Sequence, residues 1–169
     1  CKIMAELKAL TEKEVEDMEW EKDIYHDINA ELERKDKLLS QLQKQQDKLY
    51  GKELLDNLAK QKKLLQDQQK LYEQKLALQK QDAKNQADYL KSQGVKIDDA
   101  TGMVLNYNDI IQAKVNAANK LSGEAKEDAI KKVEEFIEAI ENYEALVNET
   151  IWETQEAIQD TIDAQREIF

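Results

Sequence analysis

The stretch 130–158, IKKVEEFIEAIENYEALVNETIWETQEAI, decides the fold because its apolar residues return every three or four positions. That spacing places them on one face of an α-helix, and its heptad regularity is typical of helices that pair with other helices. The apolar seam residues of 122–169 are Ile130, Val133, Ile137, Ile140, Val147, Ile151, Ile158 and Ile168. The flanking or polar positions of the stripe are Phe136, Tyr143, Glu144, Thr154, Thr161, Ile162 and Gln165. The sequence therefore predicts an acidic heptad helix over 122–169.

Two more long helices are predicted upstream, an acidic-to-basic helix over 1–50 and a basic Leu/Gln/Lys-rich helix over 52–92. Their seam residues are Tyr25, Ile28, Leu32, Leu39, Leu42 and Leu49 in the first, and Leu55, Leu58, Leu65, Tyr72, Leu76 and Leu90 in the second. Gly51 predicts a kink or short turn between them. Polar seam residues such as Gln46, Lys62 and Glu144 lower stability but fix the register of helix pairing.

The composition favours the same all-α class. The 169 residues include four Gly and no Pro, with 41% hydrophobic and 36% charged residues. Because Pro and Gly are the residues that break helices, their scarcity favours long uninterrupted ones and argues against β-sandwiches, α/β nucleotide folds and disulfide scaffolds. No apolar run approaches the ~18 residues of a membrane span. Because the chain starts at Cys1, we expect it to be an excerpt from a longer protein.

The charge is distributed in blocks. Residues 34–97 carry fifteen Lys and Arg against eight Asp and Glu, for a net +7, whereas 1–33 and 121–169 are net −7 and −10. Opposite blocks would face each other if the basic helix went out and the acidic helix returned as a helical hairpin or coiled coil. The competing geometry is an extended rod whose arms pair with other chains. The predicted partner is protein in both cases, as an intrachain hairpin or a homo-oligomer. The eleven Gln of 41–81 are interpreted as a solvated helix surface rather than an aggregation segment.

The segment 93–105 departs from helical spacing. Its sequence 94–105, GVKIDDATGMVL, predicts a small β-hairpin around a turn containing Gly102. A calcium loop at Asp98, Asp99 and Thr101 is the alternative, but the EF-hand spacing is absent. A short helix is then predicted over 106–121, with Asn106 or Asn108 as its N-cap, and Ser122 caps the helix that follows.

No catalytic, cofactor or metal site is predicted, so we expect that the chain is not an enzyme. His26 is the only His, and with Cys1 it gives too few ligands for zinc. The sequence contains no phosphate-binding loop, dinucleotide fingerprint or HExxH motif. The net charge of −11 argues against nucleic acid as a partner. Trp20 and Trp152 are interpreted as seam or interface aromatics, and Trp152 as an anchor for a partner helix.

Three stretches resemble segments of phage tail tape-measure proteins: LLQDQQKLYEQKLAL over 64–78, GVKIDDATGMVLNYNDI over 94–110, and LSGEAKEDAIKKVEEFIEAIENYEALVNETI over 121–151. The resemblance covers roughly residues 55–169. It implies a structural role as a length ruler and scaffold inside the tail of the virion, with other tail proteins or further copies as partners. The resemblance carries no catalytic residues over to this chain.

Two classes of function follow from these observations. The first is a long viral structural coiled coil. The second is a helical spacer or adaptor in a bacterial protein, which would place the chain in the cytoplasm. An elongated oligomer in sedimentation would favour the first class, and a compact monomeric hairpin would favour the second.

Overall fold

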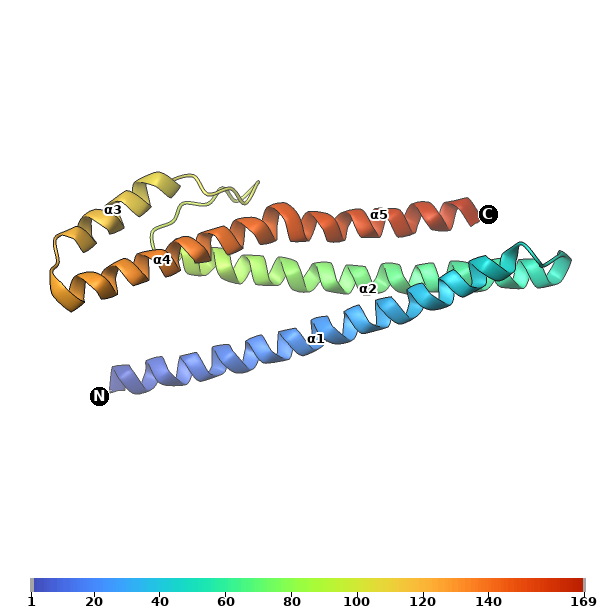
Figure 1. Ribbon diagram of the computed structural model, residues 1–169, viewed down its shortest axis with the longest axis horizontal. Helices are drawn as coiled ribbons and strands as arrows, with labels where there is room; N and C mark the ends of the chain where they lie inside the picture. The colour runs from blue at the N-terminus through green and yellow to red at the C-terminus, as the bar shows by residue number, and fades with distance from the viewer. Residues whose placement is uncertain (1, 169) are drawn as a thin grey trace. The chain divides into compact units, whose positions relative to one another are not determined.

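A computed structural model describes the backbone of residues 2–168 and the side chains of residues 22–168 (Figure 1). Its elements are α1 (Lys2–Gln46), α2 (Gly51–Ser92), α3 (Tyr107–Asn119), α4 (Gly123–Ala145), one turn of π-helix, η1 (Leu146–Thr150), and α5 (Ile151–Ile168). This architecture confirms the predicted all-α class. Cys1 and the side chain of Trp20 lie outside the described residues.

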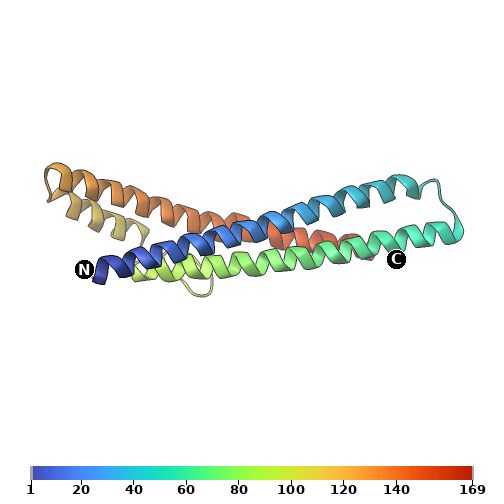
Figure 2. The same ribbon diagram turned by 90° about the horizontal axis from the view of Figure 1, so that it is seen from below.

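The chain divides into two compact units, residues 79–155 and a unit formed by 1–78 with 156–169. In the latter, α1 and α2 run side by side in opposite directions from the turn at 47–50 (Figures 1 and 2). Side-chain contacts show that this pairing is antiparallel, because residues successively later in α2 contact residues successively earlier in α1. They join Asn57 to Leu42, Gln68 to Asp36, and Lys75 to Asn29.

The core of this unit is thin and partly polar. Among the described side chains, its buried apolar residues are Ile28, Leu32 and Leu65, and its buried polar residues are Asn57, Gln61, Gln68 and Thr161. The expectation that the glutamines of 41–81 form a solvated surface is therefore wrong for Gln61, Gln68 and Gln79. The physical reason is that an amide can be buried when a hydrogen-bond partner faces it, as Gln61 and Gln68 show.

The 79–155 unit has an apolar core. Its buried cluster consists of Leu90, Val95, Phe136, Ile140 and Tyr143, and half-buried alanines, aliphatic residues and Tyr107 pack around it. Ile140 has no exposed surface. Residues from α2, the following loop and α4 thus meet in one place, while α3 folds back along α4 (Figure 1).

The loop after α2 starts with a helix-ending motif. The Val95 amide donates to the Leu90 carbonyl and the Gly94 amide to the Lys91 carbonyl, each at 3.0 Å. This is the Schellman pattern, in which the residue after the helix adopts positive φ, and Gly94 has φ +95°. The motif also brings Leu90 and Val95 together, as both belong to the buried cluster.

The predicted β-hairpin over 93–105 is not supported. In the described part of the chain, residues 97 and 104 form a single isolated antiparallel bridge, and no strand is present. The Asn106 side chain explains why pairing stops there. It accepts from the Lys96 amide at 2.8 Å and donates to the Gly94 carbonyl at 3.1 Å, so it occupies backbone groups that a longer ladder needs. Asn106 precedes α3 without making a side-chain cap bond.

The buried stripe of the acidic helix becomes narrower after the π-turn η1. Before it the buried positions are Val133, Phe136, Ile140 and Tyr143, and after it they are Thr154 and Thr161. Phe136 and Tyr143, expected to flank the seam, are central, while Ile137 and Glu144 are half-buried. The buried positions 133, 140, 154 and 161 keep a seven-residue spacing across η1, so the seam keeps its heptad phase and only the second buried position of each heptad ends.

Candidate functional site

The predicted helix-pairing residues are buried to very different degrees. Leu65, Val133 and Ile140 are buried, whereas Leu55 and Ile130 are exposed. The half-buried members are Leu39, Leu42, Leu49, Leu58, Tyr72, Leu76, Ile137, Val147, Ile151 and Ile158. Leu39, Leu58 and Leu65 meet Ala164 and Ile168 of α5 around a cavity of about 350 Å³. The structure thus brings only part of the predicted seam together at this point.

A hydrogen-bonded amide cluster lies between α1 and α2. The Gln61 amide nitrogen donates to Asn57 Oδ1 at 2.6 Å and to Gln46 Oε1 at 3.0 Å. Asn57 in turn donates to the Leu42 carbonyl at 3.0 Å. Because Asn57 and Gln61 are 4% and 3% exposed, water has little access to these groups. The cluster therefore defines one register of α1 against α2, since a slipped register would leave buried amides without partners.

Three more polar contacts continue this pattern in the same unit. Buried Gln68 donates to the Asp36 carboxylate, and the Lys75 ammonium donates to Asn29 Oδ1 at 2.9 Å. Gln165 of α5 donates to Gln69 of α2 at 2.8 Å. Helices α1, α2 and α5 are therefore joined by side-chain amides as well as by apolar contacts.

Charged side chains add a partly buried ionic ladder that joins α1 and α2. The Lys35 ammonium lies 3.2 Å from Glu31 and 3.8 Å from Asp67, and Lys63 lies 3.0 Å from Asp67. Hydrogen bonds from Arg34 and Lys35 lower the pKa of Glu31 to about 2. The Lys63 hydrogen bond lowers the pKa of Asp67. Ion pairs that water still reaches contribute little stability, so they select an arrangement more than they hold it.

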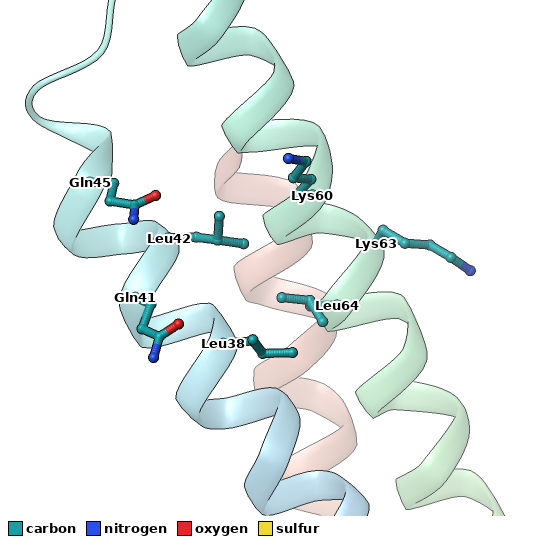
Figure 3. A pocket seen from close by; sticks show the side chains of 7 residues that line it. All are labelled: Leu38, Gln41, Leu42, Gln45, Lys60, Lys63 and Leu64. Atoms are coloured by element: carbon teal, nitrogen blue, oxygen red, sulfur yellow. The ribbon is translucent and has the colours of Figure 1, made fainter.

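An open groove lies between α1 and α2, with a volume of about 360 Å³ (Figure 3). Leu38 and Leu42 of α1 and Leu64 of α2 point into the space between the helices. The other lining residues are Gln41, Gln45, Lys60 and Lys63. Lys60 reaches toward α1, whereas Lys63 points away from the groove. This groove has an apolar floor with one lysine, Lys60, directed toward α1 at its edge. It was not predicted, because Leu38 and Leu64 lie outside the predicted seam.

In the 79–155 unit, Tyr143 ties the 94–105 loop to α4. Its hydroxyl donates to the Gly102 carbonyl at 2.9 Å. Gly102 has φ +73°, and a Cβ there would lie 3.2 Å from both Tyr143 Oη and Val147 Cγ1. Only glycine therefore fits both the backbone angle and the space at position 102.

Burial raises the pKa of Tyr143 above its usual value, and the positive charge of Lys91 offsets part of that effect.

The turn acids of this loop have structural partners. Asp98 accepts a hydrogen bond from the Ala100 amide at 2.8 Å, and Asp99 pairs with Lys91 at 2.8 Å. Across the described residues, no three His, Cys, Asp or Glu side chains are grouped so that they could hold a metal ion. His26 is an exposed residue of α1.

Sequence reasoning missed Asn57, Gln61 and Gln68 as pairing residues. Gln61 and Gln68 are one heptad apart, and Gln61 immediately precedes Lys62, which was assigned to the seam. That seven-residue recurrence is the available signal. It was not decisive, because glutamine in a charged helix is more often on the surface.

Comparisons with known proteins found no match: no family model, no curated protein and no solved structure matches the chain. In the part that the structure describes, no helix combines the length and the apolar character needed to cross a membrane.

Proposed function

We propose that this chain is a structural helical segment of the tape-measure kind, acting as a length ruler and scaffold in the tail of a virion. The observation that carries the proposal is the register-defining amide cluster of Asn57, Gln61 and Gln46. A long helix pair with a thin apolar core and buried amides has a fixed alignment without great stability. A ruler that assembles in one alignment and later leaves its tube needs this combination.

In this proposal the basic and acidic helices form an intrachain helical hairpin or coiled coil, and the partners are tail proteins or further copies. Two contacts inside one unit support the pairing. Gln165 donates to Gln69, and the cavity that contains Leu58 and Leu65 is closed on another side by Ala164 and Ile168. Burial of Leu65 adds an apolar contribution of about 2 kcal/mol.

The test is tail length in the phage that encodes this chain. An in-frame deletion of 29–42 together with 62–75 removes two heptads from each of α1 and α2 and preserves the seam phase. At 1.5 Å per residue, the tail should shorten by about 42 Å if both helices are extended end to end, or by about 21 Å if the hairpin persists. Replacing the deleted residues with an unrelated helical sequence of equal length should restore the wild-type length. Unchanged tails after the deletion would refute the ruler.

A second candidate is an adaptor module that binds a partner helix in a bacterial protein. The open groove with Leu38, Leu42 and Leu64 favours it, because the apolar side chain of Leu38 is exposed there and those of Leu42 and Leu64 are only half-buried. Helix-in-groove recognition places an amphipathic helix on such a surface. Sedimentation of the full chain separates the candidates, since an adaptor predicts a compact monomer and a ruler predicts an elongated oligomer.

A further inference from the structure

An exposed tryptophan lies on the acidic helix. Trp152 of α5 is 57% exposed, although indole is among the side chains that gain most from leaving water. Glu156 lies four residues after it in α5, so helical spacing puts this carboxylate beside the indole. Glu149 lies in the preceding turn, within η1. Both are exposed. This surface, the Trp152 knob, is an aromatic anchor with an acidic border, a composition that recurs at the centres of binding interfaces.

The groove between α1 and α2 has the opposite character. Its floor is formed by Leu38, Leu42 and Leu64, and Lys60 points from α2 toward α1. Leu38 is 37% exposed, so apolar surface remains in contact with water. The volume of about 360 Å³ lies within the ~300–1,000 Å³ range of sites that enclose a ligand, so an indole fits.

We propose that the Trp152 knob of one copy inserts into the α1/α2 groove of a second copy, with its acidic border facing Lys60. The charge blocks agree with this pairing, because the groove belongs to the +7 segment 34–97 and the knob to the −10 segment 121–169. A second copy is the occupant because both complementary halves are present on this one chain. The inference rests on the proposed scaffold function and names the surface by which copies would join.

Such a contact uses two different surfaces, so it is heterologous. Each added copy exposes a new knob or a new groove, and assembly continues into an open chain or closes into a ring. Two variants that each lack one half must then complement each other. The Trp152→Ala chain keeps its groove, and the Leu38→Glu chain keeps its knob while a carboxylate in its groove repels the acidic border.

The first measurement is sedimentation of the full chain from about 1 to 200 μM, which covers interactions of ordinary cellular strength. Wild type should associate, and both Trp152→Ala and Leu38→Glu should raise the dissociation constant at least tenfold, as loss of a central aromatic anchor does. Tyr89→Ala is the matched control, because Tyr89 is an aromatic residue of similar exposure, 55%, outside both surfaces. It should sediment like wild type. Circular dichroism establishes that each variant remains helical.

The second measurement mixes the two variants. Equal amounts of Trp152→Ala and Leu38→Glu should form a 1:1 dimer and nothing larger, because one working knob meets one working groove. A monomeric wild type over the whole range, an equal effect of Tyr89→Ala, or a mixture that stays monomeric would each overturn the inference. The tail-length deletion tests the ruler function separately. If the chain associates through these surfaces but does not set tail length, the ruler function fails while the contact between copies stands.

Discussion

The amide cluster between α1 and α2 leads to a prediction about coupling between Asn57 and Gln61. Gln61 donates to Asn57 Oδ1 at 2.6 Å, and both residues are buried. Gln61→Leu removes the donor and leaves the Asn57 oxygen buried without it, which costs about 1–3 kcal/mol. Asn57→Leu in the Gln61→Leu background removes that orphaned oxygen. The second substitution should therefore be less harmful there than in the wild-type chain, by about 1–2 kcal/mol.

The assay is urea unfolding followed by circular dichroism for wild type, both single variants and the double variant. With a slope of about 1–3 kcal/mol per molar urea, a coupling of about 1–2 kcal/mol corresponds to a difference of roughly 0.3–2 M in the urea midpoint. Asn57→Leu removes the hydrogen bond to the Leu42 carbonyl both in the wild-type chain and in the Gln61→Leu variant, so this loss cancels in the cycle. The cycle thus isolates the contact between the two amides.

The chain contains a matched control for this cycle. Gln81 donates to Asn85 at 3.0 Å with the same four-residue spacing, but the pair is exposed. Replacing both by Leu in the same design should give a coupling of only about 0.2–0.5 kcal/mol, as for surface pairs on a helix. If the buried cycle shows no more coupling than the exposed cycle, the argument that buried amides define the register is wrong.

Three further predictions concern the 79–155 unit. Gly102→Ala should lower the melting temperature more than Gly123→Ala does. Both glycines have positive φ, but only at Gly102 would a Cβ contact neighbouring atoms, at 3.2 Å. Thermal unfolding of both variants measures the difference. Tyr143→Phe should cost about 0.5–1.5 kcal/mol at neutral pH. Burial raises the pKa of Tyr143 in the folded state, so wild type should lose stability as pH rises above 10, where the unfolded state releases the Tyr143 proton first. The Phe variant lacks this proton and should lose less stability. Urea unfolding at stepped pH values checks both effects. Gln79→Met should raise stability by about 1–3 kcal/mol, because the buried Gln79 Oε1 has no hydrogen-bond partner among the described side chains. An unchanged or lower urea midpoint would contradict this.

The helices could be predicted because their signals are local. Scarce breakers and three-four spacing are properties of neighbouring residues, and Gly51 and Ser122 lie at the ends that the sequence indicated. The hairpin at 94–105 was predicted from alternation of Val95, Lys96 and Ile97. That pattern is equally compatible with a loop in which Val95 completes a Schellman motif, and the competing hydrogen bonds of Asn106 come from outside the window.

The pairing surfaces were less predictable because burial depends on how many neighbours a helix has. A two-helix seam assigns Lys62 and Gln69 to the centre of α2, yet Gln61 and Gln68 are the buried members. With α1 on one side and α5 on another, α2 has a wider buried face than a heptad seam allows. In α4, Phe136 and Tyr143 are core residues because they pack in one cluster with Leu90 and Val95, which are distant in the sequence.

The two units use different means to specify their structure. In the 79–155 unit, five buried apolar or aromatic residues form one cluster, so close packing both stabilises the unit and selects its arrangement. In the other unit, the described buried residues are four polar and three apolar, so stability per residue is lower. Selection of the arrangement then depends on hydrogen bonds such as that from Gln61 to Asn57. Replacing those amides with leucine would strengthen attraction between α1 and α2 in every register, including wrong ones. A scaffold whose alignment matters more than its strength is expected to retain them.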